Sequence, residues 1–229
     1  MPKGRISGLS TLGDVRDTIR HHLTPPSRRV SPSSALPFGS EAVQFFMDLT
    51  SACDSYLEYG SGASTLAADE LRRPFVTVES DRHFLKSVER ALSSQSPDWE
   101  QDLGILIHAD IGPTGTWGKP LFPSIPRPSR WKSYPNAPWA TLGDEFRSDL
   151  ILVDGRFRVA CALTVALQQP ESTWLLMFDD YSERREYWAT EGFLKIKERC
   201  GRMAIFEPLP SMDRQAAYLA LEHYSRDWR

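Results

Sequence analysis

Two closely spaced glycines, Gly60 and Gly62, follow a short apolar segment and lead directly into a stretch with helical character. Glycine lets the backbone turn sharply and approach a ligand, and a helix that starts there presents free N–H groups. Thr65 replaces the third glycine of a dinucleotide-phosphate fingerprint. Glu58, just before the turn, would repel a pyrophosphate but suits a cation. The turn therefore favours a cationic ligand, although helix–strand packing uses the same glycines.

Two further acidic residues follow apolar segments that are typical of strands. Glu79 comes directly after the segment at 75–78. In a doubly wound sheet its carboxylate lies beside the glycine turn, where it can accept both hydroxyls of a ribose. Asp110 follows the segment at 104–108 and could accept a hydrogen bond from an adenine amino group. The alternatives are a surface or helix-terminal acid for Glu79 and a turn residue for Asp110.

Three carboxylates, Asp154, Asp179 and Asp180, end two other apolar segments. Carboxylates at neighbouring strand ends repel one another unless a cation compensates them. A divalent ion such as Mg²⁺ is one solution, and it makes all three acids candidate metal ligands. Arg156 and Arg158 are the other solution. We favour pairing with arginine, which also allows an anionic substrate, and structural acids remain a third option.

The elements that must position these residues alternate between strand and helix from residue 54 onward. Alternation of this kind predicts an α/β fold with a doubly wound, mostly parallel, seven-stranded sheet and helices on both faces. A C-terminal antiparallel hairpin is expected around Gly201, and Ser40 is expected to cap a helix at the start of the domain. The expected strands are 56–59, 75–78, 104–108, 149–153, 173–178, 193–197 and 203–206, and the expected helices are 64–72, 81–94, 157–168 and 212–228.

The segment 112–139 interrupts this alternation because it is rich in proline and tryptophan. Proline at this density is expected to exclude helix and central strand. The segment leaves the carboxyl end of a strand, where open α/β sheets bind ligands, so we interpret it as a cap over the substrate. The aromatic side chains that could wall a pocket, or simply pack in the core, are Trp117, Trp131, Trp139 and Tyr181.

Composition sets broader limits. The 229 residues carry a formal charge of −3, which gives no electrostatic basis for binding nucleic acid. No apolar run is long enough to span a membrane, and the N-terminus lacks the apolar stretch of a secretory signal. Three widely spaced cysteines fit a reducing compartment, so we expect a cytoplasmic protein. Arginine outnumbers lysine, which favours an anionic ligand.

The ordered set of these motifs resembles that of the class I S-adenosylmethionine-dependent methyltransferases. It consists of Glu58-Tyr-Gly-Ser-Gly62, Glu79, Asp110 and Leu152-Val-Asp-Gly155, and it spans roughly residues 54–181. The string is also similar to a group of bacterial methyltransferase-like proteins. The segments 153–155 and 178–181 resemble small-molecule O-methyltransferases of the catechol and macrolide-sugar types, in which such acids hold a divalent ion. This chain departs from them by carrying Arg156-Phe-Arg158 where they have a further acid, His or Lys.

The resemblance implies transfer of a methyl group from S-adenosylmethionine to a small-molecule acceptor, with an anionic acceptor included. It implies a Rossmann-like domain at 41–229, containing the insertion at 112–139 and preceded by an N-terminal helix and arm at 1–40. The expected cofactor-binding residues are Glu58, Gly60, Ser61, Gly62, Ser64, Glu79 and Asp110. The expected catalytic residues are Asp154, Arg156 and Asp179, with Asp154 or Asp179 as the base.

Two other functions remain open at this stage. The protein could keep the fold without catalysis and bind a nucleoside-type ligand, since fold does not guarantee activity. It could also be an NAD-dependent oxidoreductase, against which the missing third glycine and Glu58 both count. For partners, we expect a small-molecule substrate without nucleic acid or membrane, and the sequence leaves a homodimer open.

Overall fold

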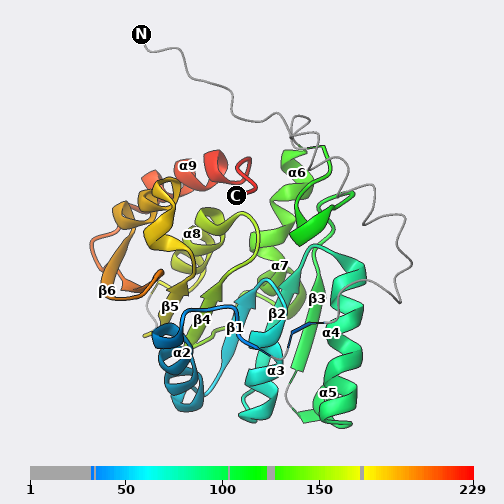
Figure 1. Cartoon of the computed structure of the whole chain (residues 1–229). Coiled ribbons are helices and arrows are strands. Elements are labelled where there is room, and N and C mark those ends of the chain that lie inside the picture. Colours follow the sequence, from blue (N-terminus) through cyan, green and yellow to red (C-terminus); the bar gives the residue numbers. More distant parts are fainter. Residues whose placement is uncertain (1–31, 34, 103, 123–126, 171–172) are drawn as a thin grey trace.

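The computed structural model describes residues 32–33, 35–102, 104–122, 127–170 and 173–229 (Figure 1). The helix expected at 11–23 lies outside the described residues. Seven strands form one sheet in the order β3-β2-β1-β4-β5-β7-β6. Strands β1 to β5 are parallel to one another, whereas β7 runs antiparallel to both of its neighbours, β5 and β6. The expected mostly parallel sheet and its C-terminal antiparallel hairpin are therefore confirmed.

The bounds of the elements follow the expected alternation closely. The strands are β1 (Tyr56–Tyr59), β2 (Phe75–Glu79), β3 (Gly104–His108), β4 (Leu150–Val153), β5 (Leu175–Phe178), β6 (Leu194–Cys200) and β7 (Met203–Pro208). The helices are α2 (Ser40–Ala52), α3 (Ala63–Glu70), α4 (Arg82–Gln95), α5 (Trp99–Asp102), α6 (Pro128–Trp131), α7 (Ser133–Leu142), α8 (Arg158–Gln168) and α9 (Arg214–Tyr224). Short 3₁₀ turns are η2 (Thr116–Gly118), η3 (Tyr181–Glu183) and η4 (Arg185–Gly192).

The sheet separates two hydrophobic cores, because successive residues of a strand point to opposite faces. Leu57 and Tyr59 of β1 belong to the core that contains α7 and α8. Tyr56 belongs to the other core, with residues of α2, α3 and α4. All four residues of β1 are buried, as they are in a strand covered on both faces. Figure 1 shows the sheet enclosed between these two sets of helices, so the doubly wound arrangement is confirmed.

The start of α2 differs from expectation. Ser40 is the first helical residue, and the preceding Gly39 occupies the cap position without a side-chain hydrogen bond. Phe38 is buried, and its ring centroid lies 5.4 Å from that of Phe46. The core therefore extends at least two residues ahead of the expected domain boundary at 40/41.

The proline-rich insertion contains helix, so its expected exclusion is wrong. Pro128 is the first residue of α6, and Pro135 lies in the first turn of α7. The first N–H groups of a helix have no acceptor within the helix, so a proline there costs no hydrogen bond. Pro138 does lie inside α7, which is held in place by the buried side chains of Tyr134 and Trp139.

Two observations on the described residues complete the fold. The three cysteines, Cys53, Cys161 and Cys200, are all free thiols. In the described part of the chain, no helix combines the length and apolar character needed to cross a membrane.

Candidate functional site

The turn after β1 packs directly against the turn after β4. Gly60 has φ +101°, and a Cβ placed there would lie 2.7 Å from the backbone of Gly155. The N–H of Gly60 donates to the carbonyl of Val78, at 2.8 Å. Only glycine satisfies both the positive φ and the close approach, so Gly60 joins the carboxyl ends of β1, β2 and β4.

Gly62 lies in a different environment from Gly60. A Cβ at Gly62 would meet no atom of the described residues within 4 Å, so the space above this residue is open in the described part of the chain. Its N–H donates to Oγ1 of Thr65, at 2.9 Å, where α3 begins. This gives the glycine turn one packed side and one open side, and the open side is where a ligand can approach the backbone.

Glu58 lies beneath this turn and is completely buried. Its carboxylate accepts hydrogen bonds from Oη of Tyr56 at 3.0 Å, from Oγ of Ser64 at 2.6 Å and from Oγ1 of Thr65. Burial raises the pKa of Glu58, and the bonds from Ser64 and Thr65 oppose that shift. Glu58 and Ser64 are therefore bonded to each other and hold the start of α3 against β1.

Glu79 ends β2 and is brought beside the glycine turn. Its Oε1 accepts the backbone N–H of Ser80 at 2.6 Å and that of Asp81 at 2.8 Å. Its Oε2 accepts Oγ of Ser61 at 3.2 Å. Burial raises the pKa of Glu79, while the N–H of Asp81 opposes the shift. Glu79 thus joins the first two strand ends with a buried carboxylate.

The first part of the insertion lies against the end of β2, because Oγ of Ser80 donates to the carbonyl of Gly118 at 3.1 Å. Trp117, next to this contact, has φ +62° and an 83% exposed side chain. Positive φ is uncommon for a bulky residue and often marks a functional segment. The other three aromatics considered for a pocket wall, Trp131, Trp139 and Tyr181, are buried in the core.

Asp110 follows β3, the neighbour of β2 in the sheet, and its side chain is exposed. It accepts the N–H of Gly112 at 2.9 Å and pairs with Arg130 of α6. The Gly112 N–H, with a further contribution from Arg130, lowers the pKa of Asp110. Asp110 thus closes the turn after β3 with one carboxylate oxygen and pairs with Arg130 through the other.

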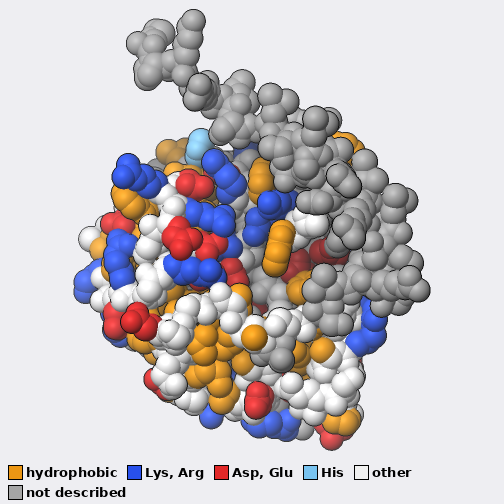
Figure 2. Space-filling view, viewed as in Figure 1, with side chains coloured by type: hydrophobic (Ala, Val, Ile, Leu, Met, Phe, Trp, Pro, Cys, Tyr) orange, Lys and Arg blue, Asp and Glu red, His pale blue; other side chains and the backbone are white. Residues whose placement is uncertain are grey.

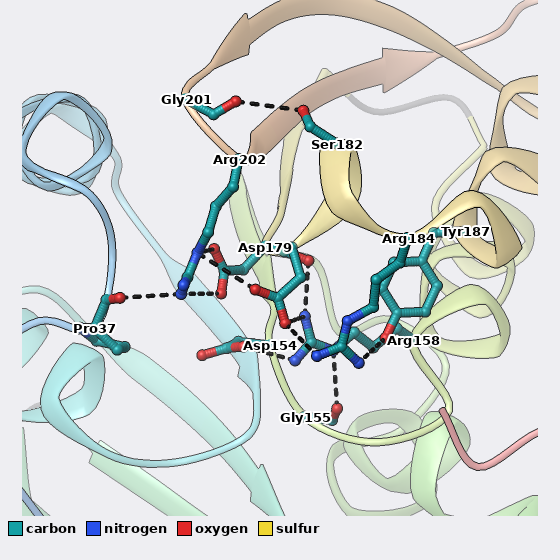
Figure 3. Close-up of polar contacts among 11 residues, drawn as sticks. Pro37, Asp154, Gly155, Arg158, Asp179, Ser182, Arg184, Tyr187, Gly201 and Arg202 are labelled. Atoms are coloured by element: carbon teal, nitrogen blue, oxygen red, sulfur yellow. Dashed lines mark hydrogen bonds and ion pairs between the residues drawn. The ribbon is translucent and has the colours of Figure 1, made fainter.

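The acids after β4 and β5 are compensated by arginines (Figure 3). Arg158 contacts Oδ1 of Asp154 at 2.9 Å. Arg202 binds both carboxylate oxygens of Asp179, at 2.9 and 2.7 Å. The carboxylate of Asp180 lies 2.8 Å from Arg184 and 3.5 Å from Arg158. Figure 2 shows acidic and basic side chains gathered together left of centre, on the side where Figure 1 places β5 and α8.

These ion pairs compensate the mutual repulsion of the three carboxylates. Among the described residues, no group of three or more His, Cys, Asp or Glu side chains is arranged to hold a metal ion. The carboxylates of Asp154, Asp179 and Asp180 instead accept hydrogen bonds or ion pairs from guanidinium groups. The structure thus does not support the candidate metal site at these three residues.

The expected partners of the acids need partial correction. Arg158 pairs as expected, but Arg156 forms no ion pair within the described residues, and its Nε has no hydrogen-bond partner there. The other partners, Arg184 and Arg202, were not identified from the sequence. Arg184 lies four residues after Asp180, a spacing that does indicate a pair. Arg202 lies in the β6–β7 turn, and no local pattern signals its contact with Asp179.

Asp154 and Asp179 differ in access although they occupy equivalent strand ends. The side chain of Asp179 is 1% exposed and both of its oxygens are bound, whereas that of Asp154 is 24% exposed. Oδ2 of Asp154 accepts no hydrogen bond from the described residues. Burial, together with Asp179 and Asp180, raises the pKa of Asp154 to about 7 against the opposing effect of Arg158. Asp154 is thus a reachable carboxyl that titrates near neutral pH.

Comparison with known proteins identifies the family. No protein-family model and no curated protein sequence matches this chain. A solved structure does match: a methyltransferase-like protein from Silicibacter pomeroyi, at 35% identity over 86% of this chain and 98% of that chain, with a TM-score of 0.74. This chain belongs to the class I S-adenosylmethionine-dependent methyltransferases.

More distant structures agree with this methyltransferase in fold. A cofactor-bound protein from MTB has 13% identity over 90% of this chain and 93% of that chain, with a TM-score of 0.50. A protein described in work on converting a disulfide bond into a thioacetal group during echinomycin biosynthesis has 10% identity over 90% of this chain and 96% of that chain, also at 0.50. The family assignment sets aside the NAD-dependent oxidoreductase alternative.

Proposed function

We propose that this methyltransferase transfers the methyl group of S-adenosylmethionine to a small-molecule acceptor. The observation that carries the proposal is the open space above Gly62, at a turn whose other side is packed and whose neighbour is the buried carboxylate of Glu79. A backbone that a ligand can approach, beside an acid at the end of β2, suits a nucleoside with a ribose. When bound, this cofactor supplies a methyl group on a positively charged sulfur, already activated for transfer.

The residues that would hold the cofactor divide into two groups. Gly60, Ser61, Gly62 and Glu79 form the turn and the adjoining strand end, and Asp110 follows β3 on the same edge. Glu58 and Ser64 act beneath the turn, where their hydrogen bond fixes the backbone that the ligand approaches. Their contribution is therefore positioning, since both side chains are buried.

On the acceptor side, Asp154 is the residue best suited to receive a proton. Its side chain is partly exposed, its Oδ2 accepts no hydrogen bond from the described residues, and a pKa near 7 is well matched to a general base at neutral pH. Asp179, bound at both oxygens by Arg202, instead holds the end of β5 in position. The remaining work of the protein is to align acceptor and donor and to exclude water from between them.

Calorimetric titration tests this function directly. The wild-type protein should bind S-adenosylhomocysteine and show no saturable binding of NAD. Incubation with methyl-labelled S-adenosylmethionine and a panel of small phenols, carboxylic acids and phosphate esters should then label one class of acceptor. Binding of NAD without binding of S-adenosylhomocysteine would sink the proposal.

A second candidate function rests on the arginines around the acids. Because Arg158, Arg184 and Arg202 neutralise the acceptor side, the protein could bind a nucleoside ligand without turnover. Saturable binding of S-adenosylhomocysteine with no labelled product from any acceptor class would favour this alternative. Turnover on any acceptor would exclude it.

A further inference from the structure

One arginine at the β4–β5 edge remains after its acids have been paired. Each of the three carboxylates there has an arginine within 3 Å, and these arginines are Arg158, Arg184 and Arg202. Arg156 is a fourth, located between Gly155 and the start of α8. This part of the edge therefore carries one guanidinium more than its three aspartates pair with.

Arg156 is a buried cation that pairs with no acid among the described residues. The residue is 9% exposed, and its buried Nε makes no hydrogen bond to the described residues. Burial, followed by the nearby charge of Arg158, lowers the pKa of Arg156. An unpaired buried charge is costly, and proteins ordinarily compensate it with an opposite charge.

Several groups around Arg156 are already bonded within the chain itself. The N–H of Phe157 donates to the carbonyl of Trp228 at 3.2 Å, and the N–H of Arg158 donates to a terminal carboxylate oxygen of Arg229 at 3.1 Å. The ring of Tyr187 lies under the guanidinium groups of Arg158 and Arg184. Among the described residues here, the unused donor is therefore the guanidinium of Arg156, and the unused acceptor is Oδ2 of Asp154.

The location of Arg156 connects it to the proposed reaction. It lies two residues after Asp154 and directly after Gly155, whose backbone packs on Gly60 of the glycine turn. A guanidinium presents N–H donors in a fork that matches the oxygens of a carboxylate or a phosphate. The charges of Arg156 and Asp154 already act on each other, and the residue before Arg156 packs on the glycine turn, so a ligand held by Arg156 would be close to the candidate base.

We propose that Arg156 binds an oxyanion, a carboxylate or phosphate group, carried by the methyl acceptor. This inference rests on the proposed function, and it narrows the acceptor to an anionic small molecule. The negative charge of the ligand compensates the positive charge of Arg156, which no acid among the described residues pairs with.

Thermal unfolding with small anions tests the site without knowledge of the acceptor. The probes are sodium benzoate for a carboxylate and inorganic phosphate for a phosphate group, each against sodium chloride at equal ionic strength. A probe at about ten times its Kd should raise the Tm of the wild type by about 3 °C. That rise should be lost in Arg156→Met and kept in Arg199→Met, which removes a half-exposed arginine paired with Glu191. A response to neither probe, or an equal response of wild type and Arg156→Met, would overturn the proposal.

A second measurement separates a binding residue from a structural one. Without any probe, Arg156→Met should unfold at the same temperature as the wild type or higher, because it removes an unpaired buried charge. A marked fall in Tm, absent from Arg199→Met, would show that Arg156 serves the fold and would overturn the proposal.

The affinity for S-adenosylhomocysteine identifies which molecule carries the anion. It should agree within twofold between wild type and Arg156→Met. A tenfold loss would assign the anion to the cofactor and overturn the acceptor assignment. Failure of the wild type to bind S-adenosylhomocysteine contradicts the proposed function instead, and the probe experiment without cofactor still tests Arg156.

Discussion

At the scale of single residues, environment gives identical side chains different chemistry. Asp154 and Asp179 follow neighbouring parallel strands and lie among the same arginines (Figure 3). Arg202 binds both oxygens of Asp179, whereas Asp154 keeps one oxygen free and has a pKa of about 7. The difference makes Asp154 the candidate base and Asp179 a structural acid.

Replacing Asp154 by Asn should remove the proton acceptor and lower the methylation rate about 10²–10⁴-fold. The wild-type rate should rise with pH through about 7, because the ionised carboxylate is the form that accepts a proton. This rise should disappear in Asp154→Asn. Initial rates from pH 5.5 to 9 check the prediction, and an unchanged affinity for S-adenosylhomocysteine controls for folding. A variant that keeps the wild-type pH profile would exclude Asp154 as the base.

Replacing Glu79 by Ala should weaken S-adenosylhomocysteine binding by about 1–3 kcal/mol, because two ribose hydroxyls would lose their acceptor. The substitution also frees the N–H groups of Ser80 and Asp81, so some loss of stability is expected. Ser61→Ala is the matched variant, since it removes the 3.2 Å bond to Glu79 and leaves the carboxylate in place. Calorimetric titration of the folded variants with S-adenosylhomocysteine measures the change in affinity. An affinity of Glu79→Ala equal to that of the wild type would reject the ribose contact.

At the scale of elements, the two glycines of the turn after β1 differ in function, because Gly60 is packed and Gly62 is not. Gly60 contacts the backbone of Gly155 and fixes the spacing between the turns after β1 and β4. Gly62 faces open space at the start of α3. The first glycine serves packing and the second leaves room for a ligand, so alanine should affect them differently.

Gly60→Ala should destabilise the fold by about 2–4 kcal/mol, since strain at positive φ adds to a clash with Gly155. Gly143→Ala is the matched control, because Gly143 has φ +92° and no atom within 4 Å of a Cβ, so strain alone should cost about 1–2 kcal/mol.

Gly62→Ala should leave stability nearly unchanged and weaken S-adenosylhomocysteine binding. Urea unfolding and calorimetry on the three variants check both predictions. Equal losses of stability in Gly60→Ala and Gly143→Ala would refute the packing argument, and full ligand affinity in Gly62→Ala would refute the open-side assignment.

At the scale of the whole molecule, Arg202 connects three distant parts of the chain. Its guanidinium extends from the β6–β7 turn to Asp179 after β5 and to the carbonyl of Pro37, at 3.0 Å, just ahead of α2. The C-terminal hairpin, the parallel sheet and the segment before the first described helix are thereby joined at the candidate acceptor side.

Arg202→Ala should destabilise the protein by about 3–5 kcal/mol, because it leaves the buried carboxylate of Asp179 without compensation. The double variant Arg202→Ala/Asp179→Asn should recover part of that loss, since the neutral amide needs no counter-charge. Urea unfolding of the two single variants and the double variant measures the coupling. Strictly additive losses would show that the ion pair does not hold the hairpin to the sheet.

The alternation of strands and helices, the faces of the strands and the acids at their carboxyl ends could all be predicted from the amino-acid sequence. These are local properties, because hydrophobic periodicity and strand length act within a few residues. The same reasoning failed at 128–142, where proline composition suggested loop although Pro128 and Pro135 lie in first turns, which need no N–H, and buried packing holds α7 around Pro138.

Only the tertiary structure decided which arginine compensates which acid, which carboxyl remains accessible and which guanidinium is left over. Arg202 meets Asp179 from a turn more than twenty residues away, while Arg156, two residues after Asp154, pairs with no acid among the residues the structure describes. Ion pairing and burial depend on distances across the fold, and the spacing of residues along the chain does not encode them.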